Sequence, residues 1–173
     1  MKLDISKYIT AENMKDIESV DIDMTELDNY QGTFPIIGHE PFELTVEVAS
    51  NKKIYITGET EVRVSIPCDR CLEDVEVSIP VQIDRSFPKE PEEVEVLSDE
   101  DEESLELVED SAFDVDEAVK RELLINWPAK VLCQENCKGI CQKCGTNLNT
   151  GSCNCEADID PRMSIFAEVF NKK

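Results

Sequence analysis

The sequence predicts an α+β fold in which an antiparallel β-sheet with one packing helix is followed by a cysteine-rich module. Three observations lead to this prediction. Residues 42–84 alternate apolar and polar side chains, residues 114–126 carry an apolar stripe at helical spacing, and residues 133–155 concentrate cysteines. A chain of 173 residues has room for one domain and an appended module. We therefore expect a sheet domain over residues 1–132 and a cysteine-rich module over residues 133–173.

The alternation over residues 42–84 is that of strands with one buried face. In residues 42–48, phenylalanine, leucine and valine alternate with glutamate and threonine, and residues 61–66 and 75–83 repeat the pattern. Successive side chains of a strand point to opposite faces, so this period of two indicates an antiparallel sheet lying on a core. The Asn-Lys-Lys sequence at 51–53 is an expected turn. The strands either remain an open sheet or close into a barrel.

Residues 90–110 differ from the rest of the chain in their charge. They are rich in aspartate and glutamate and contain no lysine or arginine, and residues 99–103 are five acidic residues in succession. Blocks of like charge repel one another and disfavour packing, so we expect a mobile acidic loop here.

A helix is predicted over residues 114–126. Asp114 is its expected N-cap, with Glu117 at the spacing of a capping box. The apolar side chains form one stripe that would pack on the sheet, and Pro128 limits the helix at its C-terminal end. Near the C-terminus, Asp160 is the expected N-cap of a second helix, because a proline follows it in the first turn.

Eight cysteines are the most specific feature of the chain. The last four follow the spacing C-x2-C-x8-C-x-C, and the first four join a CxxC pair to a C-x3-C pair over a long gap. Four thiolates are the ligands of one structural zinc ion, so we predict two zinc ions, one for each set. The predicted ligands are Cys68, Cys71, Cys133 and Cys137 for one ion, and Cys141, Cys144, Cys153 and Cys155 for the other.

The two cysteine sets differ in how they would form. The second set is local, and Gly145 suits the positive φ that a CxxC turn often requires. The first set depends on the fold. Its CxxC pair falls between two predicted strands, at the tip of a hairpin, and the helix over 114–126 would deliver Cys133 and Cys137 towards it.

A disulfide framework is the alternative use of eight cysteines, and it requires an oxidising compartment. The N-terminal residues lack the apolar core of a signal peptide, and no apolar run approaches the length of a membrane helix. We therefore expect a cytoplasmic protein with zinc-bound cysteines and no membrane segment.

The net charge of −22, from 17 basic and 39 acidic residues, restricts the choice of partners. Such a surface repels phosphate backbones, which proteins hold with lysine and arginine, so direct nucleic-acid binding is disfavoured. A basic protein partner is favoured instead, unless the acidity serves only solubility. The cysteine-rich module has few local cations on which RNA binding would depend, namely Lys138 and Lys143, with Arg162 nearby.

The sequence offers little that indicates an enzyme. An all-cysteine site is closed, whereas a catalytic zinc ion keeps an open position for water. His39 is the only histidine, and we expect it to be a loop or core residue. No glycine-rich phosphate-binding loop is visible. Redox sensing by the thiols remains an alternative, although no lone cysteine stands out as reactive.

Four motifs of the chain match those of a known family. They are C-D-R-C-L at 68–72, W-P at 127–128, the cysteine-rich run at 133–149 that ends in C-x2-C-G-T-N-L-N, and D-P-R at 160–162. With these motifs the chain resembles the DUF177 family, also called the YceD family, from the early strands to the C-terminus. The resemblance implies a role in the accumulation of large-subunit ribosomal RNA, hence in large-subunit ribosome biogenesis, and it brings no established enzymatic activity.

The resemblance and the charge together suggest a partner. The family's gene commonly neighbours that of a small ribosomal protein of the large subunit, and ribosomal proteins are small and basic. We therefore expect a non-enzymatic protein that binds a basic ribosomal protein or a pre-ribosomal particle. The alternative is an RNA-binding zinc module that acts directly on ribosomal RNA, which salt-dependent binding to RNA would reveal.

Overall fold

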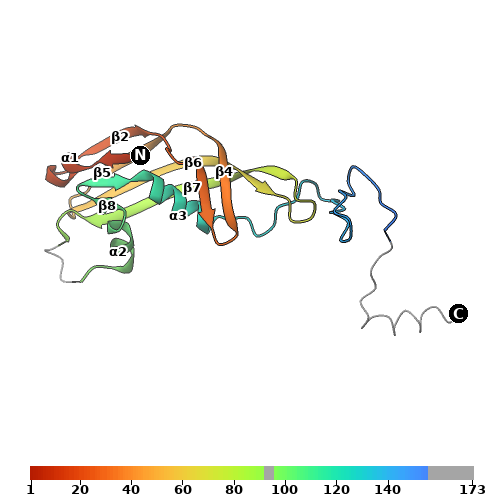
Figure 1. Ribbon diagram of the computed structural model, residues 1–173. Coiled ribbons are helices and arrows are strands. Elements are labelled where there is room, and N and C mark those ends of the chain that lie inside the picture. The colour runs from red at the N-terminus through yellow and green to blue at the C-terminus, as the bar shows by residue number, and fades with distance from the viewer. Residues whose placement is uncertain (92–95, 156–173) are drawn as a thin grey trace. The chain divides into compact units, whose positions relative to one another are not determined.

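The computed structural model describes residues 1–91 and 96–155 (Figure 1). The helix predicted to begin at Asp160 and the cation Arg162 lie outside the described residues. Within the described ranges, no helix is long and apolar enough to cross a membrane.

The chain divides into two compact units. The first, here called the sheet unit, comprises Met1–Ile66 and Asp74–Val131. The second, here called the cysteine unit, comprises Pro67–Glu73 and Leu132–Lys173, of which residues 132–155 and the turn are described. The turn at 67–73 thus belongs to the cysteine unit, although the chain enters and leaves it through strands of the sheet unit.

Antiparallel strands form most of the sheet unit (Figure 1). The larger sheet has the order β2-β5-β6-β4-β3 with β7 also paired to β6, and the smaller sheet has the order β1-β9-β8. The prediction of an α+β fold with an antiparallel sheet is confirmed. The barrel alternative is wrong, because β2 and β3 end the path of the larger sheet without pairing with each other. The strands are β1 (Lys2–Asp4), β2 (Lys15–Val20), β3 (Glu26–Asn29), β4 (Gly32–His39), β5 (Phe42–Val48), β6 (Lys53–Pro67), β7 (Asp74–Pro88), β8 (Val108–Glu109) and β9 (Ala112–Asp114).

The described helices are α1 (Ser6–Thr10), α2 (Asp99–Leu105) and α3 (Val115–Ile125). Both α2 and α3 pack against β7. The carboxylate of Asp114 accepts a hydrogen bond of 3.0 Å from the backbone N–H of Glu117, so the expected N-cap of α3 is present.

Among the described residues, the hydrophobic core lies within the sheet unit. Side chains along β5 alternate between buried and exposed, as the sequence pattern predicts, and Leu44 and Val46 are fully buried. From α3, Ala118, Val119 and Leu123 complete the same core. No described residue of the cysteine unit belongs to this core, so the cysteine unit requires another source of stability.

The acidic segment departs from its predicted structure, because Asp99–Leu105 forms the helix α2. The hydroxyl of Ser98 caps this helix by accepting the N–H of Asp101 at 3.2 Å. The carboxylate of Asp101 is buried and lies 2.7 Å from Nζ of Lys53. Acidic residues in a first turn also interact favourably with the helix dipole. The prediction of a mobile loop is therefore wrong for these residues, since it weighed charge repulsion without the cap and the buried ion pair.

Candidate metal centres

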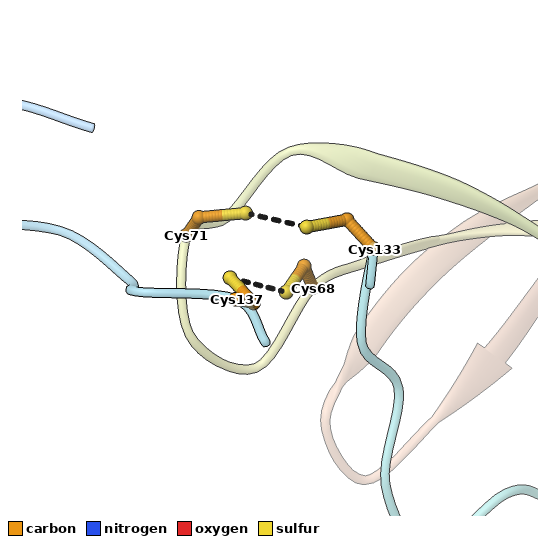
Figure 2. Close-up of side chains that lie close together, drawn as sticks. All are labelled: Cys68, Cys71, Cys133 and Cys137. Carbon is orange, nitrogen blue, oxygen red and sulfur yellow. Dashed lines mark hydrogen bonds between the residues drawn. The ribbon is translucent and has the colours of Figure 1, made fainter. Parts of the chain in front are cut away.

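Two segments far apart in the sequence supply the first cysteine set. Cys68 and Cys71 lie in the turn between β6 and β7, and Cys133 and Cys137 follow α3 (Figure 2). All four Sγ atoms lie within 4.8 Å of one another. The Sγ atoms of Cys68 and Cys137 are 3.8 Å apart, and those of Cys71 and Cys133 are 3.4 Å apart. Tetrahedral zinc with Zn–S bonds of about 2.3 Å holds its sulfurs about 3.8 Å apart, so the spacing suits one zinc ion.

The turn between β6 and β7 curls its two thiols inward. The N–H of Leu72 donates to the carbonyl of Cys68 at 2.9 Å, and the N–H of Cys68 donates to the carbonyl of Glu73 at 2.8 Å. Leu72 adopts a φ of 62°, which turns the chain sharply after Cys71. Cys68, Cys71 and Cys137 are all buried, so the first set is largely shielded from solvent.

The second cysteine set is local, as its spacing predicts. The Sγ atoms of Cys141, Cys144, Cys153 and Cys155 also lie within 4.8 Å of one another. The N–H of Gly145 donates to the carbonyl of Cys141 at 2.9 Å, which closes the CxxC turn. Gly145 has a φ of 72°, so the expected positive φ is confirmed. This set is more exposed than the first.

All eight cysteines are free thiols in the structure. Even the pair Cys71 and Cys133, with Sγ atoms 3.4 Å apart, is well beyond the length of about 2.0 Å that a disulfide bond requires. The arrangement therefore favours metal binding over the disulfide framework.

The thiols of each set differ in acidity. Burial raises the pKa of Cys68, but backbone N–H groups of the turn and of Cys133 outweigh it, and the pKa falls to about 6. The hydroxyl and backbone of Thr146 lower the pKa of Cys144 to about 6. The pKa values of Cys133 and Cys155 are raised to about 12, chiefly by a hydrogen bond to a neighbouring cysteine. Each set thus retains protons that a divalent cation would displace by favouring the thiolate form.

Two residues around the first set were missed as site residues by sequence reasoning. Arg70 donates from Nη1 to the carbonyl of Cys137 at 2.8 Å, and its own backbone carbonyl accepts the N–H of Ile140 at 3.1 Å. Asn149 donates from Nδ2 to Sγ of Cys137 at 3.2 Å, and this hydrogen bond is the chief cause of the lowered pKa of Cys137. The available signal was their position, since both residues stand inside the cysteine motifs.

The histidine lies outside both cysteine sets. His39 ends β4, and its Nδ1 atom is 3.0 Å from the carboxylate of Asp21. It lines an open depression of about 780 Å³ together with Glu59, Glu61 and Arg63. This lining mixes both signs of charge and includes no thiol, so the depression offers no ligand set comparable to the cysteines.

Comparisons with known proteins place most of the chain in one family. Residues 56–170, which include all eight cysteines, match the family model described as large ribosomal RNA subunit accumulation protein YceD. Uncharacterized proteins of Mycobacterium bovis and Mycobacterium tuberculosis are each 25% identical over 127 residues, which is 73% of this chain and 60% of theirs. An uncharacterized protein of Mycobacterium leprae is 25% identical over 130 residues, 75% of this chain and 59% of its own. The chain therefore matches about three fifths of the length of these curated relatives. No solved structure matches the chain.

Proposed function

The chain belongs to the YceD family of large ribosomal RNA subunit accumulation proteins, and we propose that it acts in large-subunit ribosome biogenesis as a non-enzymatic zinc-binding protein. In this proposal the protein works in the cytoplasm, where it binds a basic ribosomal protein before or during assembly. Zinc holds the cysteine unit in its folded form, and the acidic surface attracts the partner.

The arrangement of the thiols is the observation that supports zinc. Both sets place four Sγ atoms within 4.8 Å of one another, and soft thiolate ligands in closed tetrahedral sites suit zinc. The cysteine unit also lacks described residues in the hydrophobic core, so metal binding would supply the stability that apolar burial does not. Elemental analysis of protein purified without chelator tests this proposal. We expect two zinc ions per chain, and eight reactive thiols without metal would refute it.

The distribution of charge supports a basic protein as the partner. The net charge is −22, and most basic side chains of the described residues already form ion pairs with carboxylates, which leaves few of them to hold phosphate groups. Opposite charges accelerate the encounter of two proteins, and salt weakens the attraction. The paired basic residues are Lys2, Lys7, Lys15, Lys52, Lys53, Arg63, Arg85, Lys120 and Arg121.

Neutralising α2 tests whether this helix attracts the partner. Glu100, Glu102 and Glu103 are exposed and can be changed to glutamine, whereas Asp101 is kept because its carboxylate is buried against Lys53. We expect the triple variant to bind basic large-subunit ribosomal proteins with a slower association rate at physiological salt.

A control with the same change in net charge distinguishes α2 from the surface as a whole. Glu12, between α1 and β2, and Glu26 and Glu43, on β3 and β5, are exposed and can also be changed to glutamine. A smaller effect of this control assigns the attraction to α2. Equal effects of the two triple variants would show that only the total charge matters.

The alternative function is direct RNA binding by the cysteine unit. One observation favours it, namely that Arg70, Lys138 and Lys143 are exposed within this single unit. Binding assays with large-subunit RNA fragments and with basic ribosomal proteins, both at physiological salt, separate the two candidates. Tight binding to RNA without any protein partner would overturn the proposed function, and changing Lys138 and Lys143 to glutamine would then reduce the salt dependence of binding.

A further inference from the structure

The two cysteine sets are joined by a loop that folds back from one to the other. Ile140 and Asn147 form an isolated antiparallel bridge. The N–H of Cys141 donates to the carbonyl of Thr146, and the N–H of Leu148 donates to the carbonyl of Gly139, both at 2.9 Å. The chain after the second CxxC turn is thus hydrogen-bonded to the chain that precedes it, next to the first cysteine set.

Asn149 extends from this loop to the first cysteine set. Its Nδ2 atom donates to Sγ of Cys137 at 3.2 Å. Its Oδ1 atom accepts the backbone N–H of Lys138 at 2.8 Å and a side-chain N–H of Gln134 at 3.2 Å. The backbone N–H of Asn149 donates to Oδ1 of Asn147 at 2.9 Å, which holds the backbone from which the Asn149 side chain extends. Every one of these contacts lies within the cysteine unit.

We propose that Asn149 is a positioning residue that couples two metal centres, an inference that rests on the zinc binding proposed above. The first centre is the one that the first cysteine set would form, and the second centre is the one that the second cysteine set would form. A hydrogen bond to a ligand atom orients that ligand, and the loss of such a partner typically reduces metal affinity by about 10–100-fold. Asn149 lies between Cys144 and Cys153, so a metal ion in the second centre closes the loop that carries it. Filling the second centre therefore holds Asn149 against Cys137 and increases the affinity of the first centre.

The amide group of Asn149 suits this role better than a carboxylate would. An amide presents both a donor and an acceptor, and here the donor faces a thiol while the acceptor faces two N–H groups. A carboxylate at the same position keeps the acceptor but places a negative oxygen beside a thiolate. Asn149→Asp is therefore an almost isosteric change that keeps the acceptor and replaces the hydrogen bond to the ligand sulfur by a repulsion.

The test uses the full chain loaded with ¹¹³Cd, which replaces zinc in thiolate sites and reports on each site by its own resonance. Cys153→Ser identifies the second centre by the resonance that it abolishes or shifts most. We expect Asn149→Asp to shift the first-centre resonance and to lower the affinity of that centre by about 10–100-fold in chelator competition. Asn149→Ala, which adds no charge, should also shift the first-centre resonance and lower the affinity of the first centre. Asn154→Asp makes the matched substitution at an exposed residue between two second-centre ligands, and it should leave the first centre unchanged.

The coupling is tested by combining Asn149→Ala with Cys153→Ser. Both changes act on the first centre through the same contact, so the double variant should lose little more first-centre affinity than either single variant. Fully additive losses, or a first centre unchanged in both Asn149 variants, would overturn the inference. If the unmodified chain shows no ¹¹³Cd resonance, the proposed zinc binding fails and this inference fails with it. Two resonances that are insensitive to Asn149 would refute this inference alone.

Discussion

The sheet unit and the cysteine unit bury different kinds of side chain. In the sheet unit the buried residues are mainly leucine, isoleucine, valine and aromatic side chains, among them Tyr8 and Phe113. In the described part of the cysteine unit, the buried side chains are those of Cys68, Cys71 and Cys137. Apolar burial stabilises the first unit, and thiols placed for metal binding would stabilise the second. Two units of one chain thus have separate sources of stability, and each can be perturbed without the other.

The position of the single tryptophan makes this comparison measurable. Trp127 belongs to the sheet unit, its ring centroid lies 4.9 Å from that of Phe34, and its indole N–H donates to Gln31 at 3.2 Å. The fluorescence of Trp127 therefore reports on the sheet unit. Metal release, followed with a chromogenic chelator, reports on the cysteine unit.

Metal removal is expected to have the largest effect, and that effect should be confined to one unit. Chelation should abolish amide protection over residues 132–155, because no described apolar core remains to hold them. The fluorescence of Trp127 should change little. Hydrogen exchange with and without chelator measures both, and adding zinc back is the control. Loss of protection throughout β5 and α3 would show that the sheet unit also depends on metal.

A cavity in the core should have the reverse effect of metal removal: it should destabilise the sheet unit and leave the cysteine unit unchanged. Leu44 is fully buried, and Leu44→Ala should lower the free energy of unfolding of the sheet unit by about 2–5 kcal/mol, from lost apolar contact and the space left behind. Urea titration followed by Trp127 fluorescence measures the loss. Metal content at zero urea should remain at that of the unmodified chain, and reduced metal content would break the comparison.

The ion pair between Lys53 and the buried Asp101 of α2 should contribute less to the free energy of unfolding than Leu44 does. Burial raises the pKa of Asp101, but hydrogen bonds from Lys53 and Ser98 outweigh it, so the pKa is lower than usual. The ionised form therefore stabilises the folded sheet unit at neutral pH, and this contribution is lost as the pH falls through the lowered pKa. Asp101→Asn should lower the free energy of unfolding by about 1–3 kcal/mol near pH 7.

The pH dependence separates this ion pair from a general effect of charge. The difference in unfolding free energy between Asp101→Asn and the unmodified chain should narrow below about pH 4, where carboxylates become protonated. Glu102→Gln, an exposed neighbour in α2, should change stability little at any pH. A constant difference across the pH range would contradict the role given to the ionised carboxylate.

The smallest effect is expected at Gly145, in the cysteine unit. Gly145 has a φ of 72° and open space where a Cβ atom would lie, so Gly145→Ala should cost about 1–2 kcal/mol through backbone strain alone. Gly139 has a φ of 74°, and an added Cβ atom would lie 3.0 Å from the carbonyl oxygen of Arg70, so Gly139→Ala should cost more. The chelator concentration at half release of metal ranks the two variants. The reverse order would contradict the tight approach of Arg70.

Local patterns explain the parts of the fold that were predictable. The alternation along β5, the carboxylate cap of α3 and the positive φ of Gly145 each depend on residues within a few positions of one another. The helix α2 was missed because part of its stability comes from Lys53, which is distant in sequence and pairs with Asp101. A run of like charges does not predict a helix when one of those charges pairs, in the folded protein, with a residue that is distant in sequence.

By itself, the sequence determined the antiparallel strands, the position of α3 and the division of the cysteines into two sets, because strand period, capping and CxxC spacing are local properties. Only the tertiary structure decided that the sheet stays open, that acidic residues form α2, and that Arg70 and Asn149 both contact Cys137. These features depend on contacts between segments that are brought together by folding. Such contacts leave no period or spacing in the chain, because their geometry is set by the packing of the strands and turns that carry them.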